Sequence, residues 1–120
     1  MFNKNKLKKI SSFGNLFISE TKKEIPIKVK RFYFLKNIQK NHWRGFHLHK
    51  KLNQIVICIK GSFEFILIKK NIKKKIILKE GYSMVIPNQT WREYRSTSQN
   101  SILLVLCDRK YEKKDYRFTK

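Results

Sequence analysis

The sequence predicts a single all-β domain built as an antiparallel sandwich or barrel. Its 120 residues are enough for one domain. The apolar, β-prone runs are short and follow one another closely, and no long stretch has helical periodicity. Turn signals separate these runs, and many short strands with turns between them are typical of β sandwiches and barrels.

The strands are expected in the following order. Residues 1–10 are expected to be partly disordered, because this terminal segment is polar and basic. A short strand is predicted over residues 15–20, ahead of Pro26. Runs rich in Ile, Val, Leu and aromatic residues then predict eight strands, over 31–35, 45–49, 54–60, 63–69, 75–79, 82–86, 91–95 and 101–107.

Glycine, asparagine and proline mark the ends of these strands. The sequence contains four glycines, so each one carries positional information. Turns are predicted at residues 60–62, 70–71 and 79–81, and a further loop begins at Pro87. Since no repeat or linker interrupts the series, residues 1–120 are interpreted as one domain.

Hydrophobic residues make up 41% of the chain, which is enough for one core. Cys58 and Cys107 each lie inside an apolar run, so we expect buried thiols, and nothing points to an oxidising compartment. No run is long and uncharged enough to cross a bilayer, and the N-terminus lacks the apolar segment of a secretory signal. These features predict a cytoplasmic protein without a membrane partner.

The formal net charge of +21 has two interpretations. It can mark a polyanionic partner, such as nucleic acid or a phosphorylated metabolite. It can also reflect a composition rich in Lys, Ile, Asn and Phe, with lysines spread through every segment. A dedicated nucleic-acid surface usually clusters arginines with aromatic residues, so the dispersed lysines favour the second interpretation. A basic surface would still attract a substrate that carries a diphosphate.

The segment that contains candidate catalytic or metal-binding side chains is residues 44–49, Arg-Gly-Phe-His-Leu-His. Residues two apart in a strand project to the same face, so His47 and His49 should lie side by side, with Leu48 on the opposite face. A pair of imidazoles is suited to metal binding or to proton transfer. His42 lies in a polar loop, and we assign it no role.

The spacing around this segment resembles that of the cupins, which are jelly-roll β-barrels. Gln54 follows His49 by five residues, at the place of the metal-binding glutamate of the first cupin motif, and Gly61 follows seven later. Arg92 stands where the second motif supplies a histidine, with Gly81 and Pro87 at the expected spacing before it. Glutamine is a weak neutral ligand and arginine repels a metal ion, so we expect no metal cofactor. The same two replacements argue against a metal-dependent cupin oxygenase.

The resemblance extends to one cupin family, the nucleotide-sugar 3,4-ketoisomerases that act on dTDP-4-keto-6-deoxyglucose. The chain is similar to this family over residues 10–116. The matching segments are residues 30–34, 44–50, 54–62, 86–87, 91–93, 103–106, 111 and 115–116. The resemblance implies a cupin-type antiparallel β-barrel, a homodimer that can exchange N-terminal strands, and a keto shift from C4 to C3 without a cofactor.

The resemblance also implies roles for individual residues. His47 is expected to be the base at C3 and His49 the partner that shuttles the proton, or the reverse. Tyr33 is expected to hydrogen-bond the sugar or to assist transfer, and Gln54 to orient a histidine or to bind a sugar hydroxyl. Arg44 and Arg92 are candidates for the diphosphate, because guanidinium groups bind phosphate in a fork. Trp91 has two interpretations, either contact with the base or sugar, or packing within the barrel.

The chain departs from the family at its N-terminus. The family usually has Arg-Gly-x-Leu there, and this chain has Phe13 in place of the arginine. The C-terminal Asp-Tyr-Ile-Arg pattern is shortened to residues 115–117, which we interpret as anchoring the C-terminus. The missing arginine is the best support for the alternative hypothesis, a non-catalytic cupin that binds a nucleotide sugar or another anion.

Overall fold

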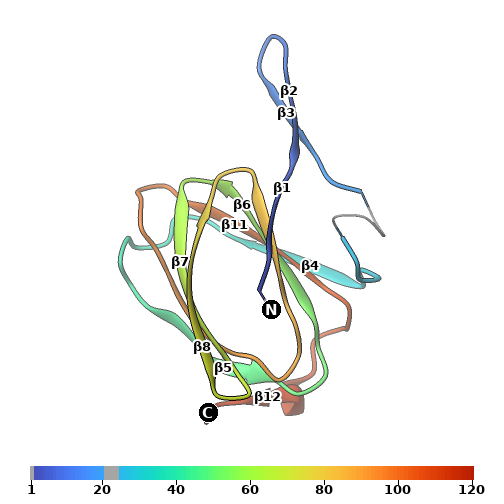
Figure 1. Cartoon of the computed structure of the whole chain (residues 1–120), viewed down its shortest axis with the longest axis vertical. Coiled ribbons are helices and arrows are strands. Elements are labelled where there is room, and N and C mark those ends of the chain that lie inside the picture. Colours follow the sequence, from blue (N-terminus) through green and yellow to red (C-terminus); the bar gives the residue numbers. More distant parts are fainter. Residues whose placement is uncertain (1, 21–24) are drawn as a thin grey trace.

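Two five-stranded antiparallel sheets face each other in a jelly-roll arrangement (Figure 1). The structure is a computed structural model that describes residues 2–20 and 25–120. The first sheet has the order β1-β9-β6-β11-β4 and the second β12-β5-β10-β7-β8. The strands are β1 (Lys4–Lys6), β2 (Lys8–Ser11), β3 (Asn15–Ile18), β4 (Arg31–Leu35), β5 (Arg44–His49), β6 (Gln54–Lys60), β7 (Ser62–Lys69), β8 (Ile72–Lys79), β9 (Tyr82–Ile86), β10 (Trp91–Ser96), β11 (Ile102–Cys107) and β12 (Tyr116–Arg117). This confirms the predicted all-β, cupin-type fold.

The core lies between the two sheets and follows the alternation of each strand. In β11, Leu103, Val105 and Cys107 are buried, while the residues between them are only partly covered. Their inward side chains meet those of the second sheet, such as Phe65 and Leu67, in one buried cluster. Both cysteines lie in this cluster, as their apolar surroundings predicted.

The predicted turns close the strand connections. Gly61 has a φ of +81° between β6 and β7, in the left-handed region that glycine adopts without strain. Lys70 and Asn71 have φ values of +50° and +65° in the connection from β7 to β8, where Lys69 pairs with Ile72. Two positive φ values in a two-residue loop form the turn that matches the twist of a β-hairpin.

All eight strands predicted between residues 31 and 107 are present, with small shifts at their ends. The largest shift is in β8, which begins at Ile72 rather than at residue 75. This strand lies at the edge of its sheet, and its first four residues are exposed. Lysines 73–75 therefore form strand structure without any apolar alternation, and charged side chains of this kind protect an exposed edge.

The N-terminal residues differ from the expectation of partial disorder. Among the described residues 2–10, β1 pairs with β9 and becomes the edge of that sheet, and Phe2 and Leu7 are buried. The open edge of β9 supplies backbone partners that sequence patterning does not reveal. β2 and β3 then form a hairpin that projects away from the two sheets (Figure 1). The predicted strand over 15–20 is confirmed over Asn15–Ile18.

Helical structure in the described part of the chain is limited to one 3₁₀ turn, η1 (Lys113–Asp115). No helix among the described residues is long and apolar enough to span a membrane. η1 leads into β12, which pairs with β5 and so brings the C-terminal residues next to the two histidines.

Candidate active site

A β-bulge in β5 sets the direction of His47. In the pairing with β10, His47 lies opposite Arg92 and Gly45 lies opposite Glu93, so Phe46 has no partner in this ladder. Gly45 and Phe46 have φ values of +90° and +57°. A β-carbon at position 45 would lie 2.8 Å from the backbone oxygen of Arg92, so only glycine fits there. Bulges of this kind re-aim side chains, and this one precedes the histidine pair.

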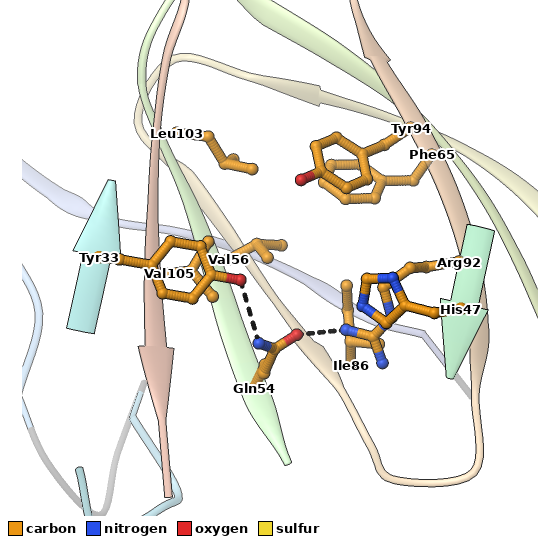
Figure 2. A pocket seen from close by; sticks show the side chains of 10 residues that line it. All are labelled: Tyr33, His47, Gln54, Val56, Phe65, Ile86, Arg92, Tyr94, Leu103 and Val105. Carbon is orange, nitrogen blue, oxygen red and sulfur yellow. Dashed lines mark hydrogen bonds between the residues drawn. The ribbon is translucent and has the colours of Figure 1, made fainter. Parts of the chain in front are cut away.

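A small pocket lies between the two sheets (Figure 2). Four of the predicted catalytic and binding side chains line it, each from a different strand. They are Tyr33 of β4, His47 of β5, Gln54 of β6 and Arg92 of β10. The full lining is Tyr33, His47, Gln54, Val56, Phe65, Ile86, Arg92, Tyr94, Leu103 and Val105. The pocket is therefore apolar, with a few convergent polar groups, as small-molecule sites usually are.

A chain of hydrogen bonds fixes one side of the pocket. The Nη1 of Arg92 donates to the Oε1 of Gln54, and its Nη2 donates to the backbone oxygen of Thr90 at 3.2 Å. The Gln54 Nε2 then donates to the Tyr33 hydroxyl at 3.3 Å (Figure 2). Because the amide supplies the proton of that bond, the hydroxyl proton of Tyr33 is free to point at a bound molecule.

His47 is arranged as a neutral base. Its Nδ1 lies 3.0 Å from the carbonyl oxygen of Gly45. A carbonyl can only accept, so Nδ1 carries the proton and Nε2 keeps the lone pair. Burial lowers the pKa of His47, the Arg92 guanidinium lowers it further, and the bond to Gly45 acts in the opposite direction. The ring is therefore neutral at pH 7.

The groups facing His47 have complementary charge states. Tyr33 keeps 36% of its surface exposed, yet desolvation of its hydroxyl in the pocket wall raises its pKa to about 12. Burial lowers the pKa of Arg92 to about 10, which still leaves the guanidinium charged at neutral pH. The pocket thus combines a neutral base, a neutral hydroxyl donor and a buried cation.

His49 lies beside His47 but is not part of the pocket lining. The ring centroids are 4.9 Å apart with the rings nearly perpendicular, which confirms that both side chains lie on one face of β5. His49 is 1% exposed, and its Nδ1 lies 3.4 Å from the Oδ2 of Asp115. Burial lowers its pKa well below the ordinary value, with Arg92 and His47 acting in the same direction.

Two further predicted residues also lie outside the pocket lining. Trp91 is buried, and its Nε1 donates to the Glu93 carboxylate at 2.7 Å, which agrees with the packing interpretation. Arg44 lies opposite Tyr94 in the sheet and offsets part of the burial that raises the pKa of that tyrosine. Gln54 makes its side-chain bonds to Tyr33, Arg92 and the Cys107 thiol, not to a histidine.

Sequence patterning missed Tyr94 and Asp115 as neighbours of the site. Tyr94 lines the pocket two residues after Arg92, so strand alternation from Arg92 could have indicated it. Asp115 reaches His49 from the C-terminal segment, 66 positions along the chain. The pairing of β12 with β5 and the backbone bonds of Asp115 to residues 50–52 bring the two together, and no local signal predicts those contacts.

The comparisons with known proteins identify the family. A family model described as FdtA, WxcM-like, C-terminal, matches residues 3–119. The chain belongs to this family. It is 34% identical over 108 residues to a TDP-4-oxo-6-deoxy-alpha-D-glucose-3,4-oxoisomerase from Aneurinibacillus thermoaerophilus, covering 89% of this chain and 78% of the relative.

Solved structures give the same result. The sugar 3,4-ketoisomerase QdtA from Thermoanaerobacterium thermosaccharolyticum, in complex with TDP, matches with a TM-score of 0.89 and 33% identity, over 98% of this chain and 88% of its own. The TDP-quinovose 3,4-ketoisomerase WlaRB from Campylobacter jejuni matches with a TM-score of 0.90 and 32% identity, over 98% and 92%. The family resemblance seen in the sequence is confirmed.

Proposed function

We propose that the protein is a sugar-nucleotide 3,4-ketoisomerase that moves the keto group of TDP-4-keto-6-deoxyglucose from C4 to C3. The observation that carries this proposal is the pocket in which the free Nε2 of His47 and the hydroxyl of Tyr33 join the buried cation of Arg92. The relatives with this activity cover most of the chain and supply the substrate class.

The reaction needs one base, one hydroxyl donor and charge stabilisation. His47 Nε2 removes the proton from C3, and the bonding electrons form the C3–C4 double bond while the C4 carbonyl oxygen becomes an enediolate oxygen. The Arg92 cation and the Tyr33 hydroxyl are suited to stabilise that oxygen as its charge develops. The imidazolium of His47 then returns its proton to C4, and the proton of the C3 hydroxyl passes to the C4 oxygen, which leaves a ketone at C3 and a hydroxyl at C4. Substrate and product are isomers, so no external oxidant or reductant is consumed.

We further propose that no metal ion takes part. The Oε1 of Gln54, the atom that would replace the cupin glutamate oxygen, already accepts a hydrogen bond from Arg92. A guanidinium at the fourth ligand position puts a positive charge where the ion would sit, and such repulsion is several kcal/mol at about 4 Å. The Arg92 cation supplies the electrostatic stabilisation that an ion would otherwise give.

The nucleotide moiety needs contacts beyond the pocket. We retain Arg44 as a candidate for the diphosphate, because it lies on β5 three residues from His47, outside the pocket lining. Arg92 is better placed for the sugar, since its Nη groups bond within the pocket wall. Trp91 stays a weaker candidate for base contact, because it is buried and bonded to Glu93.

The alternative function is a binding module for a nucleotide sugar that does not turn it over. The observation that favours it is Phe13, which replaces the family arginine and is fully exposed at the tip of the β2–β3 hairpin. Incubation with TDP-4-keto-6-deoxyglucose, followed by NMR of the sugar, separates the two. Conversion to the 3-keto isomer supports the enzyme, whereas tight binding without conversion supports the module.

We propose that the working form is a homodimer in the cytoplasm. Phe32 and Phe34 on the edge strand β4 are 62% and 56% exposed, and the projecting hairpin exposes Ile10, Phe13 and Leu16. Apolar surface of this kind usually marks a protein interface, and the hairpin is placed to reach a second copy. Light scattering at micromolar concentration should give about twice the 14.6 kDa chain mass. A mass near 14.6 kDa would refute the dimer.

A further inference from the structure

His49 is a buried histidine that lies one ring away from the pocket. It is 1% exposed, and its ring packs edge-to-face on His47 at 4.9 Å between centroids. His49 is not part of the pocket lining, whereas His47 is. This placement favours a role for His49 that acts through the position of His47.

The C-terminal segment holds this pair of rings from the other side. β12 pairs with β5, with Tyr116 opposite His49. The Tyr116 ring packs on His49 at 4.4 Å and on His47 at 5.0 Å between centroids. Phe118 stacks on Tyr116 at 6.0 Å. The rings of the two β5 histidines are thus covered by aromatic side chains from the last residues of the chain.

Asp115 is the charged group that faces His49 within this arrangement. Its Oδ2 lies 3.4 Å from the Nδ1 of His49, and the carboxylate is 7% exposed. A carboxylate facing Nδ1 favours the tautomer with the proton on that nitrogen. The edge-to-face contact at 4.9 Å between ring centroids links the orientation of His49 to that of His47.

We propose that Asp115 is a positioning residue for the isomerisation, acting through His49 to hold the His47 ring where its Nε2 faces the substrate. The inference rests on the proposed role of His47 as the base. It assigns His49 to support of His47 in place of a proton shuttle. A misplacement of about 1 Å in a reacting group costs about a hundredfold in rate, so such support has measurable consequences.

Asp115 also makes hydrogen bonds that support the fold, so an experiment must separate a loss of stability from a loss of catalytic rate. Its Oδ1 accepts the backbone N–H of Lys51 at 2.9 Å, and its Oδ2 accepts that of Leu52 at 3.2 Å. Asp108 offers a matched control, because it anchors the same loop by accepting the backbone and side-chain N–H groups of Asn53, both at 2.9 Å. No contact joins Asp108 to either histidine in the described part of the chain.

The first experiment is a double-mutant cycle on kcat and KM. Asp115→Asn and His49→Asn should each lower kcat by about 10- to 100-fold and leave KM within about twofold, because neither residue lines the pocket. The double variant should be no slower than the slower single variant, since residues that act as a unit are not additive. Asp108→Asn should lower the melting temperature and leave kcat unchanged. Unchanged kcat in Asp115→Asn, or additive losses in the double variant, would overturn the proposal.

The second experiment uses the unmodified protein, so it does not depend on a variant that folds. Long-range ¹H–¹⁵N correlation spectra report which imidazole nitrogen carries the proton. The inference predicts an Nδ1–H tautomer for His49 at pH 7. A wild-type His49 protonated on Nε2 would contradict it. Full activity of His47→Asn would instead refute the proposed base, so the two failures can be told apart.

Discussion

Replacement of His47 by asparagine removes the proposed base and changes little else. The Nδ2 of asparagine lies close to where Nδ1 of histidine lies, so it can keep the hydrogen bond to the Gly45 carbonyl, which is 3.0 Å long in the wild type. One retained bond and a small loss of buried ring surface suggest a cost in stability of about 1 kcal/mol. The pairing of β5 with its neighbouring strands should therefore persist in the variant.

The loss in turnover should be much larger than the loss in stability. A positioned general base contributes about 10²- to 10⁴-fold, which corresponds to about 2.7–5.4 kcal/mol in activation free energy. His47 is the group in the pocket whose neutral state and free Nε2 fit that role at pH 7. We therefore expect kcat to fall by this factor, with KM changed far less.

The assay is the initial rate of conversion of TDP-4-keto-6-deoxyglucose, with a thermal melt on the same sample. His42→Asn is the matched control, because His42 is exposed in a loop, and its rate should stay within about twofold of wild type. If His47→Asn folds and turns over at the wild-type rate, the assigned base is wrong.

Four further predictions follow from the same geometry. Tyr33→Phe should lower kcat by about 10²- to 10³-fold, as expected for loss of one hydroxyl donor to a developing oxyanion, and a kcat within twofold of wild type would exclude that role. Gly45→Ala should destabilise the fold by about 2–4 kcal/mol in denaturant titrations, because a β-carbon there meets the Arg92 backbone oxygen at a φ of +90°. The free energy of unfolding should fall as the pH drops below about 6.5, because His47 and His49 then become protonated in the unfolded chain, while their lowered pKa values keep them neutral in the folded protein. The slope is at most about 1.4 kcal/mol per pH unit for each histidine. A flat stability profile between about pH 6.5 and 5 would contradict the argument that burial lowers these pKa values. Turnover should survive exhaustive chelation with metal content measured on the same sample, and loss with EDTA that a stoichiometric divalent ion reverses would restore a metal-dependent mechanism.

The sequence predicted the part of the site that strand alternation and motif spacing control. His47 and His49 share a face of β5, and the spacing that placed Gln54 and Arg92 at the former ligand positions indicated side chains that do meet in one pocket. Tyr33 was found through the family resemblance, and its inward direction follows from alternation with the exposed Phe32 and Phe34.

Other features depend on contacts that a single sequence does not encode locally. His47 rather than His49 lines the pocket, because a bulge at Gly45 precedes His47 and the C-terminal strand β12 covers His49. Trp91 precedes the inward-facing Arg92 in β10, so strand alternation directs it away from the pocket. Arg44 lies opposite the pocket residue Tyr94 but is not part of the lining itself. The first strand was missed because backbone pairing with β9, rather than an apolar pattern, holds it in place.

The most direct test of the account is isomerisation in deuterated water. Wild-type protein incubated with TDP-4-keto-6-deoxyglucose in D₂O should yield the 3-keto isomer with deuterium at C4, and should exchange deuterium into C3 of the remaining substrate as the reaction reverses. Both signals follow from a base that removes the C3 proton and an enediol that is reprotonated at C4. Substrate that binds, keeps its C3 proton and is recovered unchanged would contradict the proposed reaction and identify the protein as a binding module.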